Sequence, residues 1–366
     1  MPVSAQAAVV EEKNGPFQIR TITIPTPRPD EVLVRIVATG VCATDEHMRN
    51  LDFPIPLPMI LGHEGAGVVE SVGSAVRGLD PGDHVALTFP SCGHCDTCRT
   101  AAPANCAVFP MLAFAGCRLD GTDAYSDSGV HGHFFGQSSF AQYALATERN
   151  AVRIAKDMPL ELAGPLGCGF QTGAGAVLNS LRVNAGDSLA VFGTGTVGLA
   201  AVMAANAVGA TTIVAVDVND ERLELATELG ATHTVNAKTE NVADQLRKIR
   251  AGGFDYVLEG TGRPQMLALA VELTALKGIA GLVGGAPFGT SAPIDMNILL
   301  AGRDLRGIHQ GDSVPHVFIP KLVELFRSGR FPIDRLVRTY PFADINQAFA
   351  DVASGTVIKP VLVMDQ

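Results

Sequence analysis

A glycine-rich turn between a predicted strand and a predicted helix constrains the fold of this 366-residue chain more than any other feature. Residues 193–198 read GTGTVG, a GxGxxG pattern. The apolar run 189–193 predicts a strand, the alanine-rich run 196–209 predicts a helix, and 212–217 predicts the next strand. This order of elements indicates a parallel sheet with helices on both faces.

Each glycine of the turn has its own physical reason. The first permits a tight turn, the second lets the backbone approach a pyrophosphate, and the third lets the helix pack closely on the strand. The helix N-terminus offers N–H groups and the positive end of a dipole to phosphates. Asp217 ends the next strand, can accept hydrogen bonds from the adenosine ribose, and would repel a 2′-phosphate. We therefore predict NAD binding, with a glycine turn that binds no nucleotide as the alternative. The predicted contacts are Gly193, Gly195, Thr196, Val197, Gly198 and Asp217.

The alternation of strands and helices continues beyond this unit. Runs 254–259 and 278–283 predict strands, and 266–276 predicts a helix between them. The first 150 residues are instead rich in β-branched segments and loops. The chain is also too long for one ordinary core. We predict an α/β protein with two domains, which are a Rossmann domain with a doubly wound parallel sheet at 170–306 and a β-rich domain at 1–169 and 307–366.

The charge balance excludes several classes of partner. Only 17% of the residues are charged and the net charge is −10, which disfavours binding to nucleic acid. The N-terminus has no basic patch followed by an apolar run, so we expect no signal peptide. Residues 188–216 carry no charge, but their glycines fit a strand–helix–strand unit better than a membrane helix. We expect a cytoplasmic protein without a membrane partner.

Four of the seven cysteines are crowded into one loop. They follow the pattern Cys92-x2-Cys95-x2-Cys98-x7-Cys106. Four thiolates close a tetrahedral zinc site without an open position, which is typical of structural zinc. The alternatives are an iron–sulfur cluster, a disulfide or a zinc knuckle, and the acidic charge balance disfavours the last. We predict a structural zinc at these four residues.

A second set of donors is dispersed along the chain. Cys42 lies in GVCATD, His63 in GHEG and Cys168 in GCGF. Spacing alone does not bring these three together, and the HExxH pattern of one large class of zinc enzymes is absent because residue 67 is glycine. On the residues alone, each one is more often an ordinary buried side chain than a metal ligand.

The order of these motifs resembles the zinc-dependent medium-chain alcohol dehydrogenase family. The motifs, in chain order, are GVCATD, GHEGAG, the four-cysteine loop, GCGFQTGAGA and GTGTVG. The resemblance extends over essentially the whole chain. The resemblance implies a GroES-like catalytic domain, a Rossmann coenzyme domain and an active site between them. It also implies that Cys42, His63 and Cys168 bind a catalytic zinc with a fourth position for water or alcohol, the ligand set known for this family. We therefore expect two zinc ions per chain.

The same resemblance implies roles for four neighbours of these donors. Thr44 receives the proton of the alcohol, and His47 passes it on through the nicotinamide ribose. Asp45 and Glu64 orient the zinc ligands. The alternatives are a turn cap for Thr44, a surface histidine for His47, and surface salt bridges for the two carboxylates.

Outside the glycine turn, the expected cofactor contacts match the family's pattern only in part. Ala43 stands where several relatives place a basic residue on the pyrophosphate, so this contact is missing. Lys359 matches a basic position of the last strand and is predicted to contact the cofactor, with a solvated lysine as the alternative. Arg263 is predicted to contact the cofactor as well. Cys117 belongs to none of these sites.

Two further segments bear on the substrate. FFGQSSFA (134–141) and GCGFQTGAGAVLN (167–179) resemble the aryl-alcohol branch, which includes benzyl alcohol and geraniol dehydrogenases. We predict aromatic or allylic primary alcohols and their aldehydes as substrates. Candidate pocket residues, which could also be core, are Phe53, Leu57, Phe89 and Phe134.

Three other functions remain as alternatives at this point. They are a glutathione-dependent formaldehyde dehydrogenase, a general short-chain alcohol dehydrogenase and a non-catalytic nucleotide sensor. The first needs basic residues for a glutathione carboxylate, and we identify none. The resemblance also implies a homodimer or homotetramer that pairs through the coenzyme domain.

Overall fold

The computed structural model describes residues 1–125 and 129–365, and the chain forms two compact units. The first unit is Met1–Cys168, Val314–Val323 and Ile333–Gln366, and the second is Gly169–Ser313 and Glu324–Pro332. The segment predicted as the return to the first domain, 307–366, is thus divided between the units. The domain boundaries drawn from the sequence stay a prediction.

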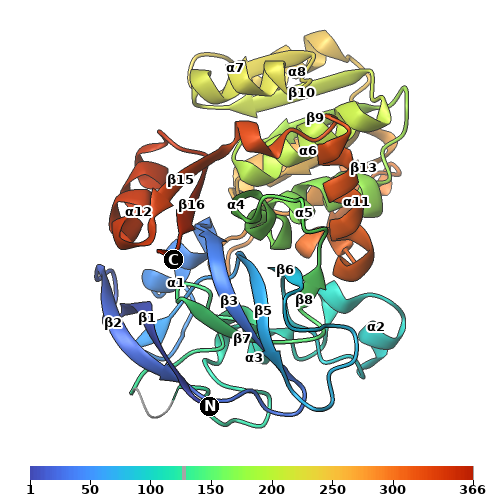
Figure 1. Ribbon diagram of the computed structural model, residues 1–366. Helices are drawn as coiled ribbons and strands as arrows, with labels where there is room; N and C mark the ends of the chain where they lie inside the picture. The colour runs from blue at the N-terminus through green and yellow to red at the C-terminus, as the bar shows by residue number, and fades with distance from the viewer. Residues whose placement is uncertain (126–128, 366) are drawn as a thin grey trace. The chain divides into compact units, whose positions relative to one another are not determined.

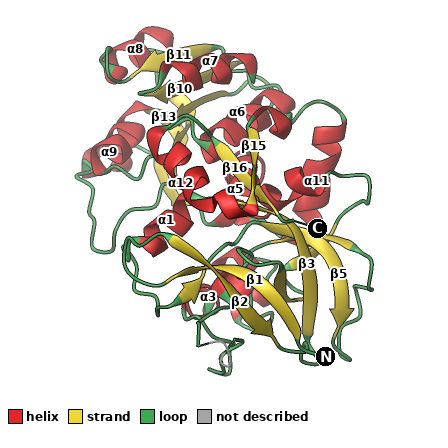
Figure 2. Ribbon diagram, turned by 60° about the vertical axis from the view of Figure 1, so that its left-hand side comes forward, coloured by secondary structure: helices red, strands yellow, loops and turns green. Residues whose placement is uncertain are grey.

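The first unit is built on two antiparallel-rich sheets. Its main sheet has the order β15-β16-β3-β5-β6-β8, with β7 also paired to β3, and the smaller sheet has the order β2-β1-β4. Strand β3 is almost wholly buried because it consists mainly of β-branched and small residues. Figure 2 shows β1 and β2 as a long paired ribbon. The strands are β1 (Val3–Val10), β2 (Phe17–Ile24), β3 (Glu31–Gly40), β4 (Met59–Ile60), β5 (Gly65–Val72), β6 (His84–Leu87), β7 (Tyr143–Thr147), β8 (Ala151–Arg153), β15 (Val337–Pro341) and β16 (Lys359–Val363).

Short helices fill the connections of this unit. They are α1 (Ala43–Arg49), α2 (Asp96–Arg99), α3 (Phe109–Phe114), α4 (Leu160–Ala163) and α12 (Ile345–Ser354). Helix α11 (Pro315–Arg327) belongs to the first unit up to Val323. One core of aliphatic and phenyl side chains holds the sheets together, with Phe17 and Phe140 in edge-to-face contact.

The second unit is the predicted parallel sheet. All its pairings are parallel, in the order β11-β10-β9-β12-β13-β14. Figure 1 shows α7 and α8 beside β10. The strands are β9 (Ser188–Phe192), β10 (Thr212–Asp217), β11 (His233–Asn236), β12 (Phe254–Glu259), β13 (Thr274–Leu282) and β14 (Asp304–Gly307). The helices are α5 (Gly169–Gly175), α6 (Thr196–Val208), α7 (Asp220–Glu228), α8 (Val242–Ile249), α9 (Pro264–Leu273) and α10 (Met296–Leu300).

Strand order reverses on the two sides of β9. The chain runs from β9 outward to β10 and β11, and then returns to place β12 on the other side of β9. Ligands of open parallel sheets bind at such a reversal, beyond the carboxyl ends of the strands. The glycine turn follows β9 directly, so the fold puts it at this point. Among the described residues, no helix is long and apolar enough to cross a membrane.

Candidate metal centres and active site

The four-cysteine loop brings its sulfur atoms into one cluster. The Sγ atoms of Cys92, Cys95, Cys98 and Cys106 all lie within 4.8 Å of one another. Two of the pairs, Cys92–Cys98 and Cys95–Cys106, are 4.0 Å apart. A tetrahedron with Zn–S bonds of about 2.3 Å has sulfur atoms about 3.8 Å apart. The cluster therefore fits a closed tetrathiolate zinc site.

The loop around this cluster has little packing of its own. Helix α2 has four residues, and none of them is buried. The Thr97 hydroxyl lies 3.2 Å from Cys95 Sγ and lowers the pKa of that thiol to about 5. All four cysteines are free thiols in the structure. A metal bound by the four sulfur atoms would add a cross-link to the packing of Ala104 and Cys106 in the core.

The dispersed donors meet in the first unit. One ligand atom each from Cys42, His63, Glu64 and Cys168 lies within 4.8 Å of the others. Cys42 ends the loop after β3, and His63 and Glu64 stand just before β5. Cys168 is the last residue of the first segment of the first unit and is buried. The fold thus brings together three donors that spacing alone could not.

Asp45 orients two of these donors. Its Oδ1 lies 3.0 Å from His63 Nδ1 and accepts a hydrogen bond from the Gly62 amide at 3.1 Å. Its Oδ2 accepts from the Cys42 amide at 3.1 Å. Because Asp45 holds Nδ1, His63 Nε2 is the ring nitrogen that can bind a metal. This buried atom has no hydrogen-bond partner among the described residues. An unsatisfied imidazole nitrogen beside two thiols is the donor set of a zinc site with an open position.

Lys359 requires a correction. It was predicted to contact the cofactor, but only 1% of it is exposed. Its Nζ donates to Glu64 Oε2 at 2.8 Å, Glu64 Oε1 at 3.0 Å and the Val41 carbonyl at 2.9 Å. Burial would lower the pKa of the ammonium, but Glu64 raises it well above the usual lysine value. All three N–H bonds are thus used inside the first unit, and none is left for a pyrophosphate.

The two predicted proton-transfer residues lie on α1. The Thr44 hydroxyl is 3.8 Å from Cys42 Sγ and half-buried. The His47 side chain is about half exposed, and its Nδ1 lies 2.7 Å from Asp52 Oδ2. Thr44 therefore lies next to the metal-ligand candidate Cys42, whereas His47 lies at the protein surface.

Aromatic rings gather beside His63. The Phe135 ring centroid is 4.6 Å from that of His63, and the Phe134 centroid is 5.7 Å away. Phe53, Phe89 and Phe134 all belong to this chain of rings; Phe89 and Phe134 are buried in the core, whereas Phe53 and Leu57 are partly exposed and pack against it. The members missed from the sequence are Phe109, Phe114 and Phe135. For Phe135 the sequence did hold a signal, the consecutive pair Phe134–Phe135. Two adjacent rings in a loop point in different directions, and each needs apolar neighbours to pack against.

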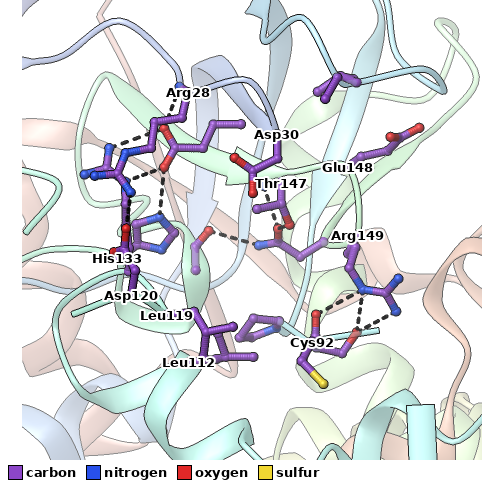
Figure 3. Close-up of a pocket in the computed structure, with 18 of the residues that line it drawn as sticks. Arg28, Asp30, Cys92, Leu112, Leu119, Asp120, His133, Thr147, Glu148 and Arg149 are labelled. Atoms are coloured by element: carbon purple, nitrogen blue, oxygen red, sulfur yellow. Dashed lines mark hydrogen bonds and ion pairs between the residues drawn. The ribbon is translucent and has the colours of Figure 1, made fainter. Parts of the chain in front are cut away.

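A separate cavity of about 480 Å³ lies near the four-cysteine loop (Figure 3). The Arg118–Glu31 ion pair lines it, and His133 lies 3.8 Å from Glu31. Burial would raise the pKa of Glu31, but His133 and Arg118 lower it to about 2. Arg28 pairs with Asp120 on the same wall. These charges compensate one another, and none of the dispersed donors lines this cavity among the described residues.

In the second unit the glycine turn has the geometry that its pattern requires. Gly193 has φ +91°, which only glycine adopts easily. No heavy atom of the described residues lies within 4 Å of where a Cβ of Gly195 would be, which leaves room for a pyrophosphate. A Cβ on Gly198 would collide with the Gly193 carbonyl, so the helix can start this close only with glycine. Thr196 and Val197 form the first turn of α6.

Carboxylates end the strands on both sides of β9. Asp217 Oδ2 accepts from the Thr194 amide at 2.6 Å and from its hydroxyl at 2.8 Å, which fastens the turn to β10. Glu259 at the end of β12 is fully buried and accepts from the Gly262 amide at 3.1 Å. Arg263 follows, exposed, at the start of α9. Glu259 was missed, although an acidic residue that ends an apolar strand run was the same signal that marked Asp217.

Comparisons with known proteins agree with this geometry. Residues 28–156 match the alcohol dehydrogenase GroES-like domain, and residues 196–328 match the zinc-binding dehydrogenase family. The chain is 45% identical to a geraniol dehydrogenase of Castellaniella defragrans, over 99% of this chain and 98% of that protein.

Solved structures give the same result over the whole chain. An alcohol dehydrogenase zinc-binding domain protein from Burkholderia ambifaria is 52% identical, with a TM-score of 0.98 over 100% of both chains. The benzyl alcohol dehydrogenase of Acinetobacter calcoaceticus is 44% identical, with a TM-score of 0.97 over 99% of this chain and 100% of that one. The predicted combination of a GroES-like and a Rossmann-type parallel-sheet domain is confirmed.

Proposed function

Since this chain belongs to the zinc-binding dehydrogenases with an alcohol dehydrogenase GroES-like domain, and is thus a zinc-dependent alcohol dehydrogenase, we propose that it oxidises aromatic or allylic primary alcohols reversibly to aldehydes with NAD. The observation that carries the substrate class is the group of phenyl rings next to His63. Two similar proteins, a geraniol and a benzyl alcohol dehydrogenase, support it.

We propose that Cys42, His63 and Cys168 hold a catalytic zinc and that the four-cysteine loop holds a structural one. A zinc ion held by these three residues would supply Lewis-acid polarisation of the alcohol oxygen. Asp45 fixes the imidazole of His63, and the Glu64–Lys359 pair balances charge beside the thiols. Thr44 takes the hydroxyl proton, and His47 with Asp52 passes it to solvent.

An alcohol panel with the zinc-loaded enzyme and NAD tests the substrate class. We expect kcat/KM for geraniol and benzyl alcohol to exceed that for ethanol by at least about 100-fold, or about 2.7 kcal/mol, because burial of only three to four more CH2 groups at about 0.8 kcal/mol each supplies this difference. Faster turnover of ethanol, or of the formaldehyde adduct of glutathione, contradicts the proposal.

NAD is favoured over NADP by the charge of Asp217 at the end of β10. Asp217→Asn removes the negative charge and also replaces one of two oxygens that accept backbone N–H bonds. We therefore compare the NADP/NAD ratio of kcat/KM, which we expect to rise about tenfold or more, equivalent to about 1.4 kcal/mol. Glu224→Gln, an exposed residue of α7, is the matched control and should leave the ratio unchanged. Equal ratios in the wild-type enzyme and Asp217→Asn would refute this role. We also assign Arg263 to the cofactor.

A homodimer through the second unit is the assembly we propose. Strand β14 is the last of its sheet and each of its four residues is exposed, and an unpaired edge invites pairing with a second copy. Large apolar side chains between 276 and 305 are exposed as well, including Phe288 at 80% and Leu300 at 85%. Light scattering should give twice the monomer mass, and Leu300→Lys together with Leu305→Lys should give monomers. A tetramer or monomer in the wild type would contradict the dimer.

A reducing cytoplasm is the compartment we propose, because the cysteines must stay thiolates to bind zinc. Among the described residues, every cysteine is free.

A further inference from the structure

We propose that Gln137 and Thr88 are positioning residues that fix the main chain at His63 relative to the main chain at Cys168. The inference rests on the assignment of these two residues to the catalytic zinc. Asp45 already links Cys42 to His63, but it does not reach the third donor. The hydrogen bonds of Gln137 and Thr88 supply this missing link.

The Gln137 amide is fully buried and binds three main-chain groups. Its Nε2 donates to the His63 carbonyl at 2.9 Å and to the Thr88 carbonyl at 3.2 Å. Its Oε1 accepts from the Gly65 amide at 3.1 Å. The amide therefore holds the backbone on both sides of Glu64 and ties the start of β5 to the residue after β6.

Thr88 continues the connection toward the third donor. Its hydroxyl donates to the Gly167 carbonyl at 2.7 Å, and Thr88 is fully buried. Gly167 directly precedes Cys168, and a Cβ on it would collide with the Leu87 carbonyl, so this backbone lies against the end of β6. A continuous set of buried hydrogen bonds thus runs from His63 through Gln137 and Thr88 to the peptide before Cys168.

The turn that carries Gln137 is held in a demanding conformation. His133, Phe135 and Ser138 have φ of 64°, 51° and 53°, in the left-handed region that non-glycine residues avoid. Such a backbone persists only where its surroundings determine it. Here the Ser138 hydroxyl accepts from the Phe134 amide at 2.9 Å and donates to the Ile60 carbonyl at 2.7 Å. Ile60 lies three residues before His63, so the segment that leads to His63 also fixes the turn and the direction of the Gln137 side chain.

Partners that orient metal ligands typically change metal affinity by about 10–100-fold when removed. Thr88→Val and Gln137→Leu keep the approximate volume but delete the hydrogen bonds. Thr88→Ser keeps the hydroxyl and is the conservative rescue. Thr274→Val is the matched control, because the buried Thr274 hydroxyl also donates to a main-chain carbonyl at 2.7 Å, but in the second unit.

The experiment measures zinc release to a chelator from the zinc-loaded enzyme and the ligand-field spectrum of cobalt placed in the Cys42–His63–Cys168 site. We expect Thr88→Val and Gln137→Leu to release one zinc about 10–100-fold faster and to shift the cobalt bands. Thr88→Ser and Thr274→Val should match the wild type, even where Thr274→Val lowers Tm.

Unchanged release and spectra in either folded variant, or a Thr88→Ser that behaves like Thr88→Val, would overturn the inference. If Thr88→Val does not fold, Gln137→Leu decides alone. A wild-type enzyme with zinc only at the four cysteines is a different failure, because it contradicts the proposed function itself.

Discussion

Replacing Cys168 by serine should abolish alcohol oxidation and leave one zinc ion per chain. Serine is a poor zinc ligand beside a thiolate and an imidazole, so the site keeps only Cys42 and His63 as strong donors. Loss of the metal removes several kcal/mol of stabilisation of the transition state. We therefore expect kcat/KM for benzyl alcohol to fall by about 10⁴-fold. Steady-state kinetics and zinc analysis of the same sample measure both effects.

Cys117→Ser is the matched control for this change. Cys117 lies outside both groups of donors among the described residues, so this variant should keep two zinc ions and full activity. Cys42→Ser should reproduce the loss seen with Cys168→Ser. Two zinc ions and near-normal turnover in Cys168→Ser would remove this residue from the site.

Replacing Cys95 by serine should release the other zinc and open the loop around it. Because α2 buries no side chain and only Ala104 and Cys106 of the loop are buried, we expect a metal at the sulfur cluster to be the main source of local stability. Structural zinc sites of this kind contribute about 10–16 kcal/mol of apparent binding free energy in isolated peptides. A loss of only about 3 kcal/mol of loop stability raises the population of molecules with an open loop by roughly 100-fold. The cleavage rate rises by the same factor when the loop opens and closes faster than the protease cuts it.

Limited proteolysis with mass spectrometry locates this effect. New cuts should fall between residues 92 and 106, while the rest of the chain resists because most of its core side chains lie outside the loop, whose core members are only Ala104 and Cys106. Zinc analysis should again give one ion per chain. Cys117→Ser should show wild-type cleavage, and an equally resistant Cys95→Ser would mean that the loop does not depend on metal.

Prediction from the sequence succeeded where a local pattern determines the structure. The strands 212–217 and 254–259 were placed at the observed residues, since each is an apolar run between breakers. Strands β11 and β14 were not predicted, because edge strands are partly or wholly exposed and their side chains lack an apolar pattern. The helix predicted at 266–276 ends at Leu273, because Thr274 already pairs with Phe254 in the sheet.

The residues of the candidate sites also fall into local motifs and contacts between distant segments. The four cysteines and the glycine turn are local, so their sequence spacing alone was sufficient to propose these two sites. The link between Lys359 and Glu64 joins residues 295 positions apart, and only the pairing of β16 with β3 brings them together. For the same reason Gln137 and Thr88 gave no signal, because what they contact is main chain from distant segments.

The contrast between the contiguous cysteines and the scattered donors has a consequence for biosynthesis. Domains begin to fold from the N-terminus while the ribosome is still at work. The tetrathiolate loop is complete once Cys106 has left the exit tunnel, so it can capture zinc early. The reactive centre has to wait for Cys168, and the ammonium of Lys359 arrives only with the last strand. On the proposed two-zinc assignment, we therefore expect translation to order metal loading, with the loop filled before the Cys42–His63–Cys168 site.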